Sequence, residues 1–367
     1  MKNALNEENL IKKIIKEINK KVTTPIYIME VCGTHTECIV KYGIKSLISD
    51  KVNLISGPGC PVCVSDESFI DEAIFLSKIE DIIICTFGDL MKVRGSKHTL
   101  QEAKSKGADI RIIYSPQSCI NIAKENKDKK VVFLSVGFET TSPIIASVIK
   151  TTKANNINNL FFLTSLKIME PILKKILGQS ESKINGLILP GHVAVIQGSK
   201  YFSFIPDEFN MPNAICGFSE LDILSGIYTI IQQINKSIPI DTYNLYKRWV
   251  KKSGNVKAKE LMNEVYTLED VTWRDIGLVP SSALVINNNF KSMDARKVFN
   301  IEHMIFKESE KSVIENKKCI CGKIMMGYKS PKECELFSTR CNYENPVGPC
   351  MVSREGVCRI AYKGGVI

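Results

Sequence analysis

Two cysteines separated by two residues follow a glycine–proline turn in the stretch GPGCPVCV, residues 57–64. In this pattern Cys60 and Cys63 could form half of a zinc site, cycle between dithiol and disulfide, or simply lie in a buried turn. A zinc site would need a second pair at matching spacing, and the sequence contains none. A thioredoxin-like fold is excluded, because the pair does not follow the first strand of a small single domain. The pattern therefore favours a redox or metal-gating pair over a turn.

A third candidate thiol is Cys32, in the stretch EVCGTHTEC. Gly33 permits a sharp turn into a following helix, which would place Cys32 at the N-terminus of that helix and His35 in its first turn. A helix N-terminus lowers the pKa of a thiol, so Cys32 is expected to be a thiolate that acts as a metal ligand or a nucleophile. Cys32 and His35 could offer iron one soft and one borderline ligand. A Cys-x-x-His pattern alone is equally compatible with a structural turn.

Six cysteines lie within residues 318–367, a segment with several prolines and few apolar runs. A segment with so little core material is expected to fold around a metal centre. It lacks the paired knuckles of zinc ribbons, and thiolates on separate loops are typical of an iron–sulfur cluster. A zinc site and buried free cysteines are the alternatives. Spacing alone does not decide which four of the six are ligands: Cys319, Cys321, Cys334, Cys341, Cys350 and Cys358.

Two further motifs, GFETT and PGHV, contribute Glu139 and His192 as candidate site residues. Both motifs follow expected strands, so the two side chains are placed in a cleft of the second half of the chain. The threonines after Glu139 could bind an anion or cap a helix. His192 could serve a site or satisfy a backbone carbonyl.

Short β-branched runs alternate with helical stretches, which is the pattern of an α/β fold with parallel strands. Because the runs are apolar on both faces, we expect sheets covered by helices on both sides. The motifs above all follow strands, and the carboxyl ends of parallel strands are where α/β proteins place their sites. The expected strands cover residues 26–31, 52–56, 81–87, 109–115, 131–137, 160–165, 186–191 and 213–218.

Eight such units could close into one barrel or form two open sheets. The charged tract at 123–130 lies at their midpoint and favours two similar α/β domains, 25–120 and 121–238. The pattern changes after residue 240, where residues 243–266 look helical with a Gly-Asn break. We therefore expect a third, irregular iron–sulfur domain at 239–367. An amphipathic helix at 1–24 is expected to pack on this domain or on the first.

Composition limits the possible partners and location. The formal net charge is +10, but the lysines are interspersed with 39 acidic residues and form no cluster with aromatic residues, which argues against nucleic acid binding. No apolar run approaches the roughly 20 residues of a membrane helix. Lysines interrupt any signal-peptide core near the start, so a cytoplasmic location is expected. Thirteen cysteines in a reducing compartment indicate metal or thiol chemistry rather than a disulfide framework.

The motifs, in this order and over nearly the whole chain, resemble the hydrogenase maturation factor HypD family. They are MEVCGTHTE, GPGCPVCV, TFGDLMKV, YSP, GFETT, LPGHVAVIQG, LDIL, WRDIG and the C-terminal ECELF…C…PVGPCMVSREGVC. The resemblance implies two α/β domains and a third domain with a [4Fe-4S] cluster. The family's cluster pattern falls on Cys321, Cys334, Cys341 and Cys358. Stretches such as YSPQSC, residues 114–119, and TSLKIMEP, residues 164–171, depart from the family pattern.

The resemblance also implies a scaffold role. The family holds the iron on which two cyanides and one carbon monoxide are assembled for [NiFe]-hydrogenase, together with the small partner HypC, and cyanide arrives from HypE with HypF upstream. Cys32 is then the expected iron ligand, with His35 beside it. Cys60 and Cys63 become redox thiols between that iron and the cluster. The alternative is an iron–sulfur-dependent reductase of a protein disulfide.

Overall fold

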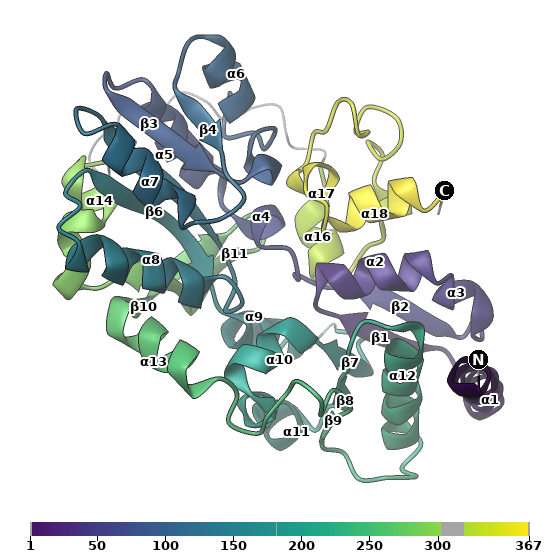
Figure 1. Cartoon of the computed structure of the whole chain (residues 1–367). Helices are drawn as coiled ribbons and strands as arrows, with labels where there is room; N and C mark the ends of the chain where they lie inside the picture. The colour runs from purple at the N-terminus through teal and green to yellow at the C-terminus, as the bar shows by residue number, and fades with distance from the viewer. Residues whose placement is uncertain (1, 181, 302–318, 366–367) are drawn as a thin grey trace.

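Two separate β-sheets, each flanked by helices, form the body of the molecule in the computed structural model (Figure 1), which describes residues 2–180, 182–301 and 319–365. All eight expected strands are present. The structure thus confirms an α/β protein with two sheets in which parallel pairing dominates.

The first sheet, called sheet A, contains five parallel strands in the order β2-β1-β7-β8-β9. Its strands are β1 (Ile26–Glu30), β2 (Val52–Ser56), β7 (Gly186–Leu189), β8 (Asn213–Ile215) and β9 (Thr242–Asn244). All five strands are short, and β1, β7 and β8 are mostly buried. Its edge strand β2 precedes the GPGCPVCV loop.

The second sheet, sheet B, contains six strands in the order β10-β11-β6-β5-β3-β4. Its strands are β3 (Ile82–Thr86), β4 (Ile110–Ile112), β5 (Lys130–Gly137), β6 (Leu160–Lys167), β10 (Tyr266–Trp273) and β11 (Gly277–Ile286). The pairs among β3 to β6 are parallel, whereas β10 and β11 form an antiparallel hairpin that joins β6. In β3 and β5, successive side chains enter different cores, as the period of a strand requires.

The sheets do not follow the expected halves of the chain, 25–120 and 121–238. β1 and β2 pair with β7, β8 and β9, while β3 and β4 pair with β5 and β6. The expectation of two consecutive sheets is therefore wrong. The regular spacing of βα units shows where strands begin, but it carries no information on which strands become neighbours. The chain leaves sheet A after β2, builds the parallel part of sheet B, and returns to sheet A with β7.

The region after residue 240 also differs from a simple helix. Its helical part is α13 (Val256–Val265), which begins at Asn255, whose side chain accepts a hydrogen bond from the backbone N–H of Ala258. The preceding residues contain β9, and the β10–β11 hairpin follows directly. Helical periodicity at 243–266 is therefore correct only beyond the Gly-Asn break. Sheet B is completed by a hairpin that the strand pattern did not predict.

The helices cover both faces of the two sheets. Those near sheet A are α1 (Lys2–Lys21), α2 (Gly33–Lys41), α3 (Ile44–Leu47), α10 (Gly191–Gln197), α11 (Phe204–Phe209) and α12 (Glu220–Ile234); those near sheet B are α5 (Glu67–Ser77), α6 (Leu100–Ser105), α7 (Ser118–Glu125), α8 (Ser142–Ala154), α9 (Met169–Leu177) and α14 (Ala295–Val298). The expected N-terminal helix is present as α1, and it packs beside α12 with Ile18 fully buried.

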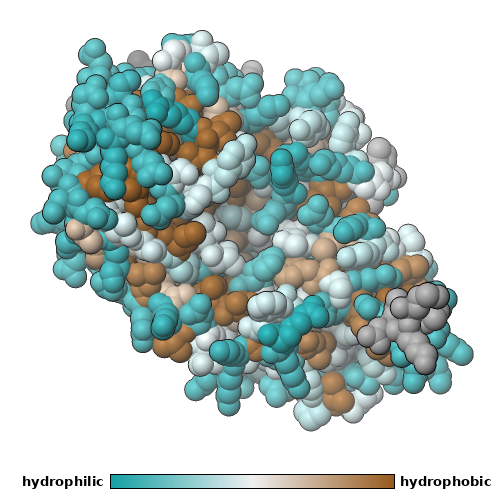
Figure 2. Space-filling model, viewed as in Figure 1, coloured by the Kyte–Doolittle hydropathy of each residue, from teal (hydrophilic) through white to brown (hydrophobic). Residues whose placement is uncertain are grey.

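The C-terminal residues add only short helices: α16 (Cys321–Met325), α17 (Pro349–Val352) and α18 (Val357–Lys363). They lie beside α2 and α4 (Pro61–Val64), as Figure 1 shows in yellow and purple. Buried residues of this segment share one hydrophobic cluster with both sheets. In the same view the surface is largely hydrophilic, and it recedes between the lobe of sheet B and the C-terminal segment (Figure 2).

Candidate functional site

Cys60 and Cys63 lie at the start of the short helix α4, directly after β2. Cys60 is the N-cap residue, its sulfur accepts a hydrogen bond from the backbone N–H of Cys63, and Pro61 occupies the first turn. The two cysteines form a disulfide with their Cα atoms 5.3 Å apart. The helix stops at Val64, and α5 begins afresh after Asp66, which caps it. The structure therefore shows this pair in its oxidised form, within a buried turn.

Cys32 lies against the same loop from the neighbouring strand. It is the N-cap residue of α2, and its carbonyl accepts the backbone N–H groups of His35 and Thr36. A Cβ atom on Gly59 would lie 2.5 Å from the backbone nitrogen of Cys32. Glycine is therefore required at 59 for this close approach. Pairing of β1 with β2 thus brings the three candidate thiols to one end of sheet A, as the sequence predicted.

Burial changes the acidity expected for Cys32. The side chain is 8% exposed, and burial raises its thiol pKa to about 12, with the negative charge of Glu355 adding to the effect. The helix N-terminus does not overcome this loss of solvation, so the expected low-pKa thiolate is wrong for the protein without metal. A soft metal ion would have to displace the thiol proton as it binds.

A buried carboxyl group supports the Cys32 turn. Glu30 accepts hydrogen bonds from the backbone N–H of Cys32, at 3.0 Å, and from the Thr36 hydroxyl. Burial raises the pKa of Glu30 to about 7. Sequence reasoning missed this residue, although an acidic residue at the end of the apolar run IYIME was a visible signal. Glu30 fixes the backbone from which Cys32 projects.

His35 is a neutral, fully buried imidazole. Its Nε2 donates to the carbonyl of Gly217 at 3.0 Å, and burial lowers its pKa to about 4. Nδ1 has no hydrogen-bond partner among the described residues. With the proton on Nε2, Nδ1 carries a free lone pair, which is the form in which histidine binds metals.

His192 belongs to this same region. Phe218 lies between two imidazoles, with its ring centroid 4.7 Å from that of His35 and 4.1 Å from that of His192. His192 stands in the first turn of α10, next to Pro190, and its side chain is exposed, whereas His35 is fully buried. The stack therefore connects the buried His35 to the surface. The sequence expectation grouped His192 with Glu139 instead.

Glu139 lies on the other sheet. It follows β5, and its Oε1 accepts the backbone N–H of Met169 and the hydroxyl of Tyr201. Its Oε2 has no partner within the described residues, and burial raises the pKa of Glu139 to about 7. The expected common cleft for Glu139 and His192 is therefore not formed within one sheet. Each residue follows a strand of a different sheet.

The C-terminal thiols gather close to this region. The sulfurs of Cys319 and Cys321 are 3.2 Å apart, and a Cβ on Gly348 would lie 2.6 Å from both. Cys350 interacts with Cys321, which with burial raises the Cys350 pKa well above its usual value; the Cys358 thiol raises it further. Burial raises the pKa of Cys341, with smaller effects of the same sign from Cys319 and Cys321.

Cys334 is also buried, and its backbone pairs with Pro331 and Phe337 in a turn. Among the described residues, no three His, Cys, Asp or Glu side chains are already arranged to hold a metal ion. The donor set nevertheless suits an iron–sulfur cluster, because several buried thiols converge around a glycine that leaves their sulfurs room. The particular four expected, Cys321, Cys334, Cys341 and Cys358, stay a prediction.

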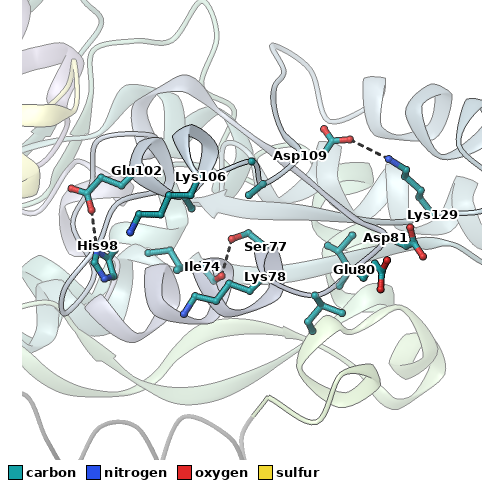
Figure 3. A pocket seen from close by; sticks show the side chains of 15 residues that line it. Ile74, Ser77, Lys78, Glu80, Asp81, His98, Glu102, Lys106, Asp109 and Lys129 are labelled. Carbon is teal, nitrogen blue, oxygen red and sulfur yellow. Dashed lines mark hydrogen bonds and ion pairs between the residues drawn. The ribbon is translucent and has the colours of Figure 1, made fainter.

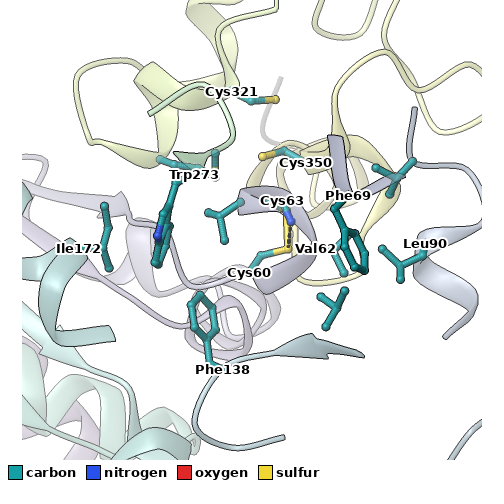
Figure 4. Packing of buried hydrophobic residues seen from close by; sticks show 14 of the residues in the cluster. Cys60, Val62, Cys63, Phe69, Leu90, Phe138, Ile172, Trp273, Cys321 and Cys350 are labelled. Carbon is teal, nitrogen blue, oxygen red and sulfur yellow. Dashed lines mark hydrogen bonds between the residues drawn. A yellow bond between two sulfur atoms is a disulfide. The ribbon is translucent and has the colours of Figure 1, made fainter. Parts of the chain in front are cut away.

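Two helix contacts join the C-terminal thiols to the other candidate residues. α17, which carries Cys350, packs on α4 beside the disulfide, and Figure 4 shows Cys321 and Cys350 on the side of α4 opposite Phe138. α18, which carries Cys358, packs on α2. Glu355 closes against Gly33, where a side chain would collide with the Glu355 backbone. The cysteine-rich segment thus packs on both the helix of the disulfide and the helix of Cys32.

Two cavities differ in their relation to this site. The one in Figure 3 lies before the start of β3 and is lined by charged pairs such as His98–Glu102 and Lys129–Asp109. It is at the opposite strand end from the thiols. A second cavity of about 630 Å³ lies between β2 and the C-terminal segment, and its wall includes Glu30. The second cavity therefore reaches Glu30, the residue that accepts the hydrogen bond of the Cys32 backbone.

Comparison with known proteins agrees with the motifs. The HypD family model, described as "Hydrogenase formation hypA family", matches residues 9–365. The chain belongs to the HypD family. The hydrogenase maturation factor HypD of Cupriavidus necator is 38% identical over 345 residues, and that of Azotobacter vinelandii is 37% identical over 345 residues. The Escherichia coli HypD protein is 35% identical over 340 residues. In all three cases the match covers 92% of this chain and 89% of the relative.

In the part of the chain that the structure describes, every helix is too short or too polar to cross a lipid bilayer.

Proposed function

We propose that this HypD-family protein is a hydrogenase maturation factor that holds iron at Cys32 while the Fe(CN)₂CO unit of a [NiFe]-hydrogenase is assembled. The observation that carries the proposal is the convergence of Cys32, the Cys60–Cys63 disulfide and the C-terminal thiols on one end of sheet A. The names of the relatives support the same role. The iron is cargo, and it leaves with the finished unit.

The residues around Cys32 suit the binding of such iron. A thiolate and the free Nδ1 of a neutral His35 would provide a soft and a borderline ligand, which favour electron-rich iron. Glu30 holds the Cys32 backbone in place by accepting a hydrogen bond from its N–H group. Burial keeps water away, because Cys32 and His35 are both in the protein interior. Cys32 loses its proton when the metal binds.

Cys60 and Cys63 would pass electrons toward this site. When bound, a [4Fe-4S] cluster on Cys321, Cys334, Cys341 and Cys358 would supply them one at a time. The packing of α17 on α4 places the cysteine-rich segment directly beside the disulfide. Reduction of the disulfide takes two electrons and two protons and gives two thiols. The loop that contains Gly59 is in close contact with the Cys32 backbone, so it would transmit the opening of the disulfide to the iron ligand.

We further propose that the protein acts in the cytoplasm with a HypC-like small partner and receives cyanide from a HypE-like protein, with HypF upstream. The exposed His192 at the end of the ring stack, which leads to the buried His35, is the part of the site that such a partner could reach from outside.

Infrared spectroscopy on the anaerobic complex with a HypC-like partner tests the proposal. The wild-type complex should show bands of iron-bound cyanide and carbon monoxide. Cys32→Ala should lose these bands and keep its cluster absorbance, whereas Cys38→Ala, one turn further along α2, should keep both. A complex without any such bands after iron loading would overturn the proposal. Catalytic reduction of a protein disulfide by Cys32→Ala would instead establish the reductase alternative.

A further inference from the structure

A lysine is buried at the end of β6 without a charged partner. Lys167 is 1% exposed, and none of the ion pairs among the described residues includes it. Its amine donates a hydrogen bond to the Ser165 hydroxyl at 2.9 Å and lies 5.8 Å from the centre of the Trp273 ring. Burying an ammonium group in this way is costly for folding.

Two hydroxyl groups connect this amine to the turn that holds the disulfide. The Ser165 hydroxyl is 3.0 Å from that of Ser65, and Ser65 donates to the carbonyl of Pro61 at 2.9 Å. Pro61 lies between the two bonded cysteines. A continuous chain of hydrogen bonds therefore runs from Lys167 to the CPVC turn. It is buried, since Ser65 is fully inaccessible to solvent and Ser165 is nearly so.

Two aromatic rings, those of Trp273 and Phe138, lie near both the Lys167 amine and the disulfide. Trp273, over which the amine lies, packs on Phe138 with 5.9 Å between ring centroids. Figure 4 shows Trp273 and Phe138 facing Cys60 and Cys63. Water is excluded from this region, because Trp273 and Cys63 are both almost completely buried. A charge on Lys167 is thus poorly screened at the disulfide.

Few charges compete for the amine. Burial lowers the pKa of Lys167 to about 7, Asp66 before α5 opposes this effect, and Arg296 in α14 adds to it. Arg296 is itself paired with Glu72 at 2.7 Å. Burial thus brings the titration of the Lys167 amine into the neutral pH range.

We propose that Lys167 is a positioning residue for the Cys60–Cys63 couple: its buried ammonium, held by Ser165 and Ser65, stabilises the thiolate that leaves when the disulfide is opened. This inference rests on the redox role proposed above for the pair. It assigns to Lys167 an electrostatic function, in addition to its place in β6.

The step balances as ordinary thiol–disulfide exchange with a dithiol reductant. A thiolate of the reductant attacks one cysteine sulfur, the S–S bond breaks, and its electron pair leaves on the other sulfur. The leaving thiolate then takes a proton. The second thiol of the reductant displaces the first cysteine and releases a cyclic disulfide, so two electrons and two protons reach Cys60 and Cys63. Lys167 lowers the barrier of the bond-breaking step while it is charged.

The rate of reduction by dithiothreitol, as a function of pH, tests this inference on the full-length protein. The rate is measured in the range where it rises with reductant concentration. Free thiols are alkylated at each time point, and the peptide that contains both cysteines is then analysed by mass spectrometry. We expect Lys167→Met to react about tenfold more slowly than wild type near pH 6. The ratio should approach one near pH 8.5, where the wild-type amine has lost its charge.

Two further variants separate charge from structure. Lys167→Arg keeps a permanent charge, so its rate should exceed that of Lys167→Met at every pH, including pH 8.5. Ser165→Ala breaks the hydroxyl line and should reduce the dependence on pH. Circular dichroism and thermal melts confirm that each variant is folded.

Equal pH profiles for wild type, Lys167→Met and Lys167→Arg would overturn the inference alone. A wild-type disulfide that no concentration of dithiol reduces in the folded protein would also overturn the inference, whereas the proposed function, in which the electrons come from the cluster, is decided by the infrared measurement described above. The two failures are therefore distinguishable.

Discussion

The thiols at the end of sheet A and the thiols of the C-terminal segment are held in different ways. Cys32 and Cys60 are the N-cap residues of helices that follow paired strands, and Cys63 lies within the second of these helices, so backbone hydrogen bonds fix their places. The segment 319–365 has only short helices and one isolated bridge, between Phe337 and Cys341. Its buried sulfurs are brought together by turns rather than by a sheet. The first group is preorganised by the fold, whereas our proposal is that a bound cluster stabilises the second.

Removal of bound metal should have the largest effect, and it should be confined to one region. We expect anaerobic chelation of iron to increase protease cleavage within 319–365 by at least about tenfold, while peptides from both sheets stay protected, because metal-binding energy becomes folding energy in such segments. Limited proteolysis with mass spectrometry measures this.

The choice of ligands is tested in the same experiment. Cys341→Ser should reproduce the chelated pattern and lose iron and sulfide. Cys334→Ser and Cys350→Ser then decide the fourth ligand, since only the true ligand should behave like Cys341→Ser. Equal protection of residues 319–365 from protease with and without metal would contradict the distinction between the two groups of thiols.

A substitution at Gly59 should disturb the preorganised thiols. Gly59→Ala puts a methyl group 2.5 Å from the Cys32 nitrogen, and we expect a loss of about 2–3 kcal/mol in the free energy of unfolding. Gly88→Ala is the matched control, because the nearest atom to its Cβ would be 3.7 Å away. Urea denaturation of both variants measures the difference. If Gly59→Ala left the free energy of unfolding unchanged, the backbone at Cys32 would not be held as tightly as the structure indicates.

A smaller effect should come from the buried carboxyl group of Glu139. Its folded-state pKa of about 7 exceeds the usual value of 4.5, so the native state keeps a proton that the unfolded chain releases. The stability contributed by neutral Glu139 should therefore be present below pH 4.5 and fall by about 3 kcal/mol as the pH rises to 7, then level off.

Glu139→Gln should remove this decline, because its amide oxygen can still accept the bonds from Met169 and Tyr201 while its NH₂ takes the position of the unpartnered Oε2. Identical pH profiles for wild type and Glu139→Gln would refute the assignment.

The sequence predicted the strands well because they are local features. β-branched runs marked all eight expected strands, and Gly33 marked the start of α2. The sequence did not predict the exchange of strands between the sheets, because pairing partners depend on contacts between distant residues. For the same reason Glu139 and His192 were placed together, although they follow strands of different sheets.

Burial was the other quantity that the sequence did not supply. Cys32 was expected to be acidic from its helix position, yet its enclosure by Gly59 and Glu355 raises its pKa. Glu30, Lys167 and Phe218 were missed because their importance comes from what surrounds them. A carboxyl group or an amine in an apolar strand is the signal that could have identified the first two.

The return of the chain to sheet A has a consequence for synthesis on the ribosome. β1 and β2 emerge early, but β7, which lies beside β1, is made more than a hundred residues later. The nascent chain can complete β3 to β6 in the interval, while the Cys32 loop still lacks its neighbouring strand. Glu355, which covers Gly33, is made later still. The order of translation therefore delays closure of the Cys32 loop until the cysteine-rich segment has been made.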